Sequence, residues 1–191
     1  MVLTGAIVTA EELVKGLSTR LAEYLPGADT GQPEFTDKRT CWTKMTGQAL
    51  ASYARAIGVD TQVTEHSEFG AQRQYNAFWI KGDAALLAIT SAWGDREELE
   101  RSFHRLLLVK APQKLLLYTC AKWQDAVLDQ LSGAVLRYPH HLEGEQYIAA
   151  NLLGAERKTY GTSLNIPRSG VLKHEETVFR PIAGSPFAWR S

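Results

Sequence analysis

The chain has 191 residues, with 21 basic and 21 acidic side chains, so its formal net charge is zero. Hydrophobic residues make up 45% and charged residues 22%, a composition that excludes extended disorder, collagen-like repeats and a coiled-coil rod. No global field draws such a molecule onto nucleic acid or anionic lipid, so any binding of that kind must be local. The length predicts a single domain over residues 1–191.

The cysteine content and the N-terminal sequence indicate the compartment. The two cysteines, Cys41 and Cys120, lie far apart in the sequence. A chain of this size needs no disulfide framework, so we expect reduced thiols and a cytoplasmic protein. The apolar N-terminal stretch lacks a basic region, and no segment approaches the roughly 20 apolar residues that span a bilayer. We therefore expect no membrane partner.

Two helices are predicted in the first third of the chain. Thr9 can cap the first helix, and Glu12, three residues later, completes a capping box. Pro26 ends this helix. The second helix is expected from about Arg39 to Ile57, and it contains no carboxylate. The apolar face of the first helix consists of Leu13, Leu17, Leu21 and Leu25.

The hydrophobic period then changes from helical to strand-like. Residues 61–65, 74–80 and 84–90 are predicted as strands, and the last two are close enough to form a hairpin. Residues 96–110 form a strongly amphipathic helix, and residues 114–120 form another buried strand. A strand, a helix and a strand in this order predict a parallel pair. The side chains of this helix expected to face water are Glu97, Glu98, Glu100, Arg101 and Arg105.

The remaining third is predicted less sharply. A helix is expected over residues 123–135, residues 149–153 suit either a helical turn or a strand, and a short strand is expected over residues 177–179. The whole order predicts an α/β protein, with a mixed central sheet and helices on both of its faces.

The stretch from Arg73 to Tyr118 carries a family resemblance. It reads Arg-Gln-Tyr-Asn-Ala-Phe-Trp at 73–79, Ala-Ile-Thr-Ser-Ala-Trp-Gly at 88–94, Arg-Leu-Leu at 105–107 and Ala-Pro-Gln-Lys-Leu-Leu-Leu-Tyr at 111–118. This framework resembles the restriction-endonuclease-like PD-(D/E)XK superfamily and covers about a quarter of the chain. In small members the first hairpin strand reads like Arg-Val-Asp-Val-Val-Trp, and the second carries Ala-Ile-Glu, one further residue, and Glu or Lys. The resemblance implies a restriction-endonuclease-like mixed sheet.

The resemblance also implies a Mg²⁺ site, which requires two or three carboxylates on the hairpin. This chain has Asn76 or Ala77 in place of the first acid, Thr90 in place of the second, and Ala92 in place of the third charged residue. The second helix offers Gln48 where many relatives have a further acid. Neutral oxygens do not compensate the charge of Mg²⁺. We therefore expect a catalytically inactive, nuclease-like protein with no catalytic residue, no metal and no cofactor.

Two segments keep alternatives open. Glu65, His66 and Glu68 precede the hairpin, and displaced acids of this kind could rebuild a metal site. The alternative function is then an active Mg²⁺-dependent nuclease acting on DNA or RNA. Residues 140–145, His-His-Leu-Glu-Gly-Glu, also have metal-ligand side chains, but a surface loop is the simpler interpretation because no helix fixes their spacing.

The expected partners are a protein or a nucleic acid. A protein partner, or a second copy of this chain, could bind the aromatic residues Phe187 and Trp189 near the C-terminus. A mobile-element or defence setting is implied by analogy of fold alone. A solvated helix face with Glu/Arg pairs explains part of the basic cluster equally well. The candidate nucleic-acid-binding residues are Arg73, Arg101, Arg105 and Lys110.

Overall fold

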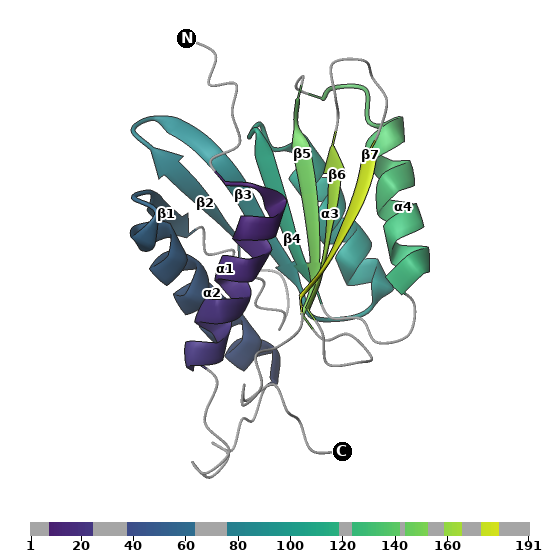
Figure 1. The fold of residues 1–191 in the computed structure, drawn as a ribbon. Coiled ribbons are helices and arrows are strands. Elements are labelled where there is room, and N and C mark those ends of the chain that lie inside the picture. Colours follow the sequence, from purple (N-terminus) through teal and green to yellow (C-terminus); the bar gives the residue numbers. More distant parts are fainter. Residues whose placement is uncertain are drawn as a thin grey trace.

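The computed structural model describes residues 8–24, 38–63, 76–118, 124–141, 144–152, 159–165 and 173–179. Within these ranges the chain forms four helices and seven strands, and it is an α/β protein with one mixed sheet (Figure 1). The helices are α1 (Ala10–Tyr24), α2 (Lys38–Ala56), α3 (Arg96–Leu108) and α4 (Gln124–Arg137). The strands are β1 (Asp60–Val63), β2 (Asn76–Lys81), β3 (Ala84–Ala92), β4 (Gln113–Tyr118), β5 (Gln146–Asn151), β6 (Thr159–Asn165) and β7 (Lys173–Phe179).

The strands lie in the sheet in the order in which they occur in the chain. Strands β3, β4 and β5 are parallel, and every other neighbouring pair is antiparallel. Helix α3 connects β3 to β4 and helix α4 connects β4 to β5, which is the crossover that a parallel pair requires. The predicted hairpin and the predicted parallel pair are both confirmed. The segment left open between helix and strand is strand β5, and the last strand is longer than predicted.

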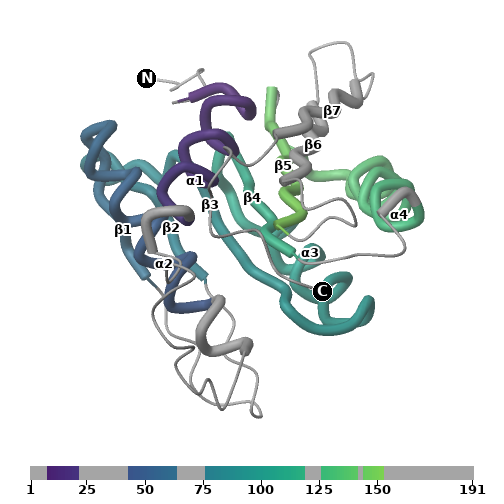
Figure 2. Tube along the Cα trace, turned by 60° about the horizontal axis from the view of Figure 1, so that its bottom comes forward, coloured from purple at the N-terminus to yellow at the C-terminus, as the bar shows by residue number. Residues whose placement is uncertain are grey.

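The sheet separates two layers of helices (Figure 2). Helices α1 and α2 cover one face, where Leu17 and Leu50 pack with Trp79, Leu87 and other strand residues. Helices α3 and α4 cover the other face, with Phe103 and Leu131 in the second cluster of buried residues. Strand β4 is buried along its whole length, as expected for a strand covered on both faces. In the described ranges, no helix combines the length and the apolar character needed to cross a membrane.

Helix α1 begins with the predicted capping box. The backbone amide of Thr9 donates to Oε2 of Glu12 at 2.9 Å, and the amide of Glu12 donates to Oγ1 of Thr9 at 3.1 Å. These reciprocal bonds satisfy amide donors that the first helical turn leaves open. The predicted apolar face is buried at Leu13, Leu17 and Leu21, while Leu25 lies outside the described residues.

The start of α3 corrects one expectation from the sequence. Glu98 does not face water, because its side chain is only 2% exposed. The side chain of Asp95 accepts from the amide of Glu98 at 2.9 Å, and Oε1 of Glu98 accepts from the amide of Trp93 at 3.2 Å. A carboxylate at the third position of a helix turns back toward the chain that enters it and lies at the positive end of the helix dipole. Glu98 therefore fixes the turn from β3 into α3.

Candidate functional site

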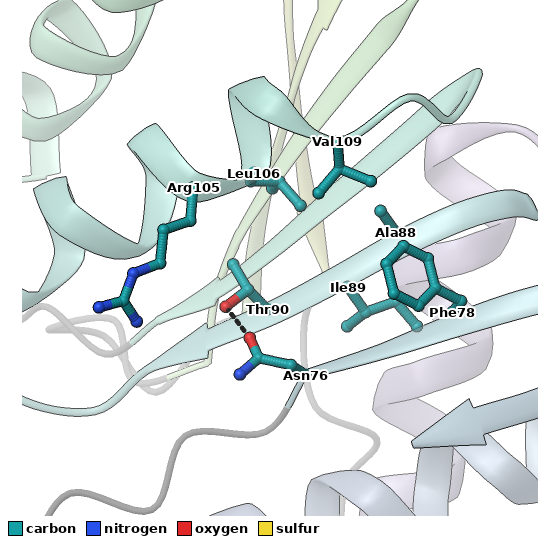
Figure 3. A pocket seen from close by; sticks show the side chains of 8 residues that line it. All are labelled: Asn76, Phe78, Ala88, Ile89, Thr90, Arg105, Leu106 and Val109. Carbon is teal, nitrogen blue, oxygen red and sulfur yellow. Dashed lines mark hydrogen bonds between the residues drawn. The ribbon is translucent and has the colours of Figure 1, made fainter. Parts of the chain in front are cut away.

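The β2/β3 hairpin brings together the two residues that stand at the predicted metal positions. Asn76 is the register partner of Thr90, and Phe78 is the partner of Ala88. The hydroxyl of Thr90 donates to Oδ1 of Asn76 at 2.6 Å (Figure 3). The pair of Asn76 and Thr90 and the pair of Phe78 and Ala88 line one pocket together with residues of helix α3. The two pairs therefore lie on the sheet face that α3 covers.

This hairpin pocket has a volume of about 200 Å³. Figure 3 shows the Asn76 and Thr90 pair and the guanidinium of Arg105 toward one end, with the ring of Phe78 at the other. Thr90 is 5% exposed, whereas Arg105 is exposed to solvent. The eight lining residues are Asn76, Phe78, Ala88, Ile89, Thr90, Arg105, Leu106 and Val109.

The other residues assigned to the metal positions do not join this pocket. Ala92 is buried in the α3/α4 layer, 2% exposed. Ala77 belongs to the core on the opposite face, which helix α2 covers. Gln48 is an exposed residue of α2, and α2 covers the opposite face of the sheet from the pocket. The structure thus joins Asn76 to Thr90 and separates both from Gln48.

Acidic residues do not gather at the pocket in the part of the chain that the structure describes. None of the eight lining residues is Asp or Glu. The described residues also contain no group of three or more His, Cys, Asp or Glu side chains that could hold a metal ion. Glu65, His66 and Glu68, the candidates for displaced acids, lie outside the described residues.

The four candidate cations lie in different surroundings. Arg105 lines the pocket. Arg101, one turn earlier on α3, is half-exposed and lies 3.7 Å from the carboxylate of Glu97. Lys110 donates to the carbonyl of His140 at 2.6 Å and lies near the ring of Tyr138, and it is not among the residues that line the pocket. Arg73 lies outside the described residues.

The sequence does not predict a buried cluster of polar residues around Lys114, here called the Lys114 cluster. Nζ of Lys114 lies 2.7 Å from Oε1 of Glu145, and both side chains are fully buried. The same ammonium donates to the hydroxyl of Tyr147 at 3.0 Å and to the carbonyl of Leu107 at 3.1 Å. The Tyr147 hydroxyl donates to Oε2 of Glu145 at 2.7 Å. Nδ1 of His141 lies 3.2 Å from that oxygen.

Burial dominates the acid–base properties of this cluster. Loss of solvent lowers the pKa of Lys114, and the Glu145 carboxylate opposes that shift. Burial, followed by the hydrogen bond and the charge of Glu145, raises the pKa of Tyr147.

The interpretation of residues 140–145 as a surface loop is wrong for Glu145, because this residue is only 1% exposed. The cluster joins the end of α3, strands β4 and β5, and the connection that precedes β5.

The comparisons with known proteins add no relative. No family model matches the chain, and neither a curated protein nor a solved structure matches it significantly. The function of the chain is therefore inferred from its own geometry.

Proposed function

We propose that this chain is a catalytically inactive, restriction-endonuclease-like module that binds nucleic acid along the β2/β3 hairpin and helix α3. The observation that carries the proposal is the hairpin pocket, in which Arg105 stands beside the neutral pair of Asn76 and Thr90. A cation at this place suits a phosphate, whereas it opposes a divalent metal ion.

The fold supports the restriction-endonuclease-like assignment. That resemblance implies a hairpin whose second strand leads into a helix and then into a parallel strand. Strands β2 and β3, helix α3 and strand β4 have this order and these directions. The order and the directions of these elements support the assignment to this family, which is part of the proposal.

The chemistry of the pair supports a role without catalysis. A Mg²⁺ ion keeps near-octahedral oxygen ligands and usually needs one or two carboxylates. Asn76 and Thr90 offer only neutral oxygens, and Oδ1 of Asn76 already accepts the hydroxyl of Thr90. This pair therefore suits a site without a bound Mg²⁺ ion.

The surface of α3 supports contacts to phosphates. Arg101 and Arg105 are one helical turn apart, and both are exposed. Arginine binds phosphate through planar, paired hydrogen bonds, and such contacts position a nucleic acid without reading its sequence. The cytoplasm is the compartment that we propose for this activity.

One experiment separates this proposal from the active-nuclease alternative. The purified chain is incubated with single- and double-stranded DNA and RNA, with and without Mg²⁺, and both cleavage and binding are measured. We expect binding at low salt and no cleavage. Cleavage that requires Mg²⁺ and is lost in Glu65→Gln or Glu68→Gln would contradict the proposal and establish a nuclease with displaced acids. Absence of binding to all probes would instead favour a protein partner.

A further inference from the structure

The hairpin pocket changes from polar to apolar along its length. The pair of Asn76 and Thr90 is followed, two residues along each strand, by the pair of Phe78 and Ala88. Helix α3 runs beside them, with Arg105 at the polar end and Val109, the residue that follows the helix, toward the apolar end (Figure 3). A ligand that fits must therefore have a polar or anionic part joined to an apolar part.

Phe78 gives the apolar end an aromatic surface. Its side chain is partly buried against the α3/α4 cluster and also lines the pocket. Its register partner is Ala88, which has only a methyl group, so the strand opposite leaves space beside the ring. Stacking on aromatic side chains is a general way in which proteins hold unpaired bases.

The size of the pocket limits what can enter. Its volume of about 200 Å³ is below the roughly 300 Å³ at which pockets for drug-sized ligands begin. One small planar ring suits this space better than an extended ligand. A base within a duplex is stacked on both sides and would have to leave its stack to reach Phe78, which costs energy that an unpaired base does not require.

We infer that the hairpin pocket binds one unpaired base of a nucleic-acid strand, with the phosphate beside that base held by Arg105. The inference rests on the proposed function and narrows its ligand to single-stranded nucleic acid. Asn76 and Thr90, which are hydrogen-bonded to each other at 2.6 Å, then lie beside the sugar or the base edge. Arg101, one turn earlier on α3, would exchange its exposed ion pair with Glu97 for the next phosphate.

The test measures the affinity of the full chain for a short fluorescent oligothymidylate, for the same strand paired in a duplex, and for thymidine monophosphate as a competitor. The variants are Phe78→Leu, which keeps an apolar side chain but removes the aromatic face, and Arg55→Gln as a control on the exposed surface of α2. We expect the single strand to bind more tightly than the duplex. Phe78→Leu should weaken single-strand binding about tenfold, with little change for the duplex.

Three results would overturn the inference. Binding to neither strand nor duplex would remove the proposed function together with it. Equal binding of strand and duplex, with no effect of Phe78→Leu, would remove the base pocket and leave only phosphate contacts. Competition by thymidine monophosphate at concentrations comparable to the strand would make the pocket a site for a free nucleotide. If Phe78→Leu lowers the melting temperature strongly, Val109→Phe, which fills the pocket from its rim, should give the same selective loss of single-strand binding.

Discussion

Nζ of Lys114 and Oε1 of Glu145 form a 2.7 Å ion pair with both side chains fully buried. A buried pair of this kind contributes little net stability compared with apolar residues, but removal of one partner leaves an uncompensated charge. The pair connects strand β4 to the residue just before strand β5, and Lys114 also donates to the carbonyl of Leu107 near the end of α3. We conclude that it fixes the packing of α3 onto the sheet and thereby the wall of the hairpin pocket.

Breaking this pair on one side should therefore be costly. We predict that Lys114→Met lowers the free energy of unfolding by about 3–5 kcal/mol, because Glu145 remains buried without its cation. The double variant Lys114→Met/Glu145→Gln should be more stable than the single variant, since no net charge is left inside. Urea unfolding of both variants measures the difference. The matched control is the exposed pair of Arg101 and Glu97, where Glu97→Gln should change stability by about 0–1 kcal/mol. A Lys114→Met effect as small as that of Glu97→Gln would refute this role.

The raised pKa of Tyr147 predicts how stability depends on pH. Above the ordinary tyrosine pKa of 10.0, the unfolded chain loses this proton while the folded chain keeps it. The folded state then binds more protons than the unfolded state, so stability decreases as the pH rises. Tyr147→Phe has no such proton, although it loses the bonds to Lys114 and Glu145 and should be less stable by about 1–3 kcal/mol at neutral pH.

The measurable consequence is a difference between two curves. The stability advantage of the wild type over Tyr147→Phe should shrink above about pH 10, by up to about 1.4 kcal/mol per pH unit. Tyr53, whose pKa is also raised by burial and then by the charge of Glu12, is present in both proteins. Chemical unfolding between pH 8 and about 11 tests the prediction. A constant advantage over this range would contradict it.

Helices α1 and α2 approach each other closely at Gly16. A Cβ atom built on Gly16 would lie 2.4 Å from Cζ of Tyr53. The hydroxyl of Tyr53 donates to the carbonyl of Glu12, and its ring contacts Trp79, so this ring has little freedom to move. We predict that Gly16→Ala destabilises the protein by about 1–3 kcal/mol, despite the better helix propensity of Ala.

Gly133 in α4 provides the matched comparison for that substitution. The three atoms nearest to a Cβ atom there belong to the guanidinium of Arg137, at 3.1 Å or more, which is the far end of a flexible side chain. Gly133→Ala should therefore stabilise the protein by about 0.5–1 kcal/mol. Thermal unfolding of both variants distinguishes them by sign, and stabilisation by both substitutions would show that the two helices can move apart at no cost.

The sequence predicted those parts of the fold that depend on local pattern. The change of hydrophobic period located the β2/β3 hairpin, and the amphipathic helix between two apolar strands predicted the parallel pair β3/β4. The sequence predicts an exposed Glu98 from its position on the polar face of the helix. This prediction is wrong because the side chain turns back and accepts from the amide of Trp93. The hydrogen bond between Asn76 and Thr90 depends on the register of the hairpin, which shifts between Trp79 and Ile80.

The Lys114 cluster shows why the remainder could not be predicted. Lys114 and Glu145 are distant in the sequence and meet only because β4 and β5 pair in parallel, with Lys114 opposite Tyr147. One signal was present, since a lysine at the start of an apolar strand must reach either solvent or an acid. The sequence does not identify which acid lies within reach, because that depends on the packing of α3, β4 and β5.

The salt dependence of nucleic-acid binding shows whether Arg101 and Arg105 contact phosphates. Affinity for single-stranded and duplex DNA is measured over a series of salt concentrations for the wild type, for Arg101→Ala/Arg105→Ala and for the control Arg55→Ala on the other helical layer. Each phosphate contact contributes about 0.7 to the slope of log affinity against log salt for single strands and about 0.9 for duplex. We predict that the double variant remains folded and lowers the slope by roughly 1.4 to 1.8, whereas the control leaves it unchanged. An unchanged slope in the folded double variant, or no binding by the wild type at low salt, would contradict the binding of nucleic acid along helix α3.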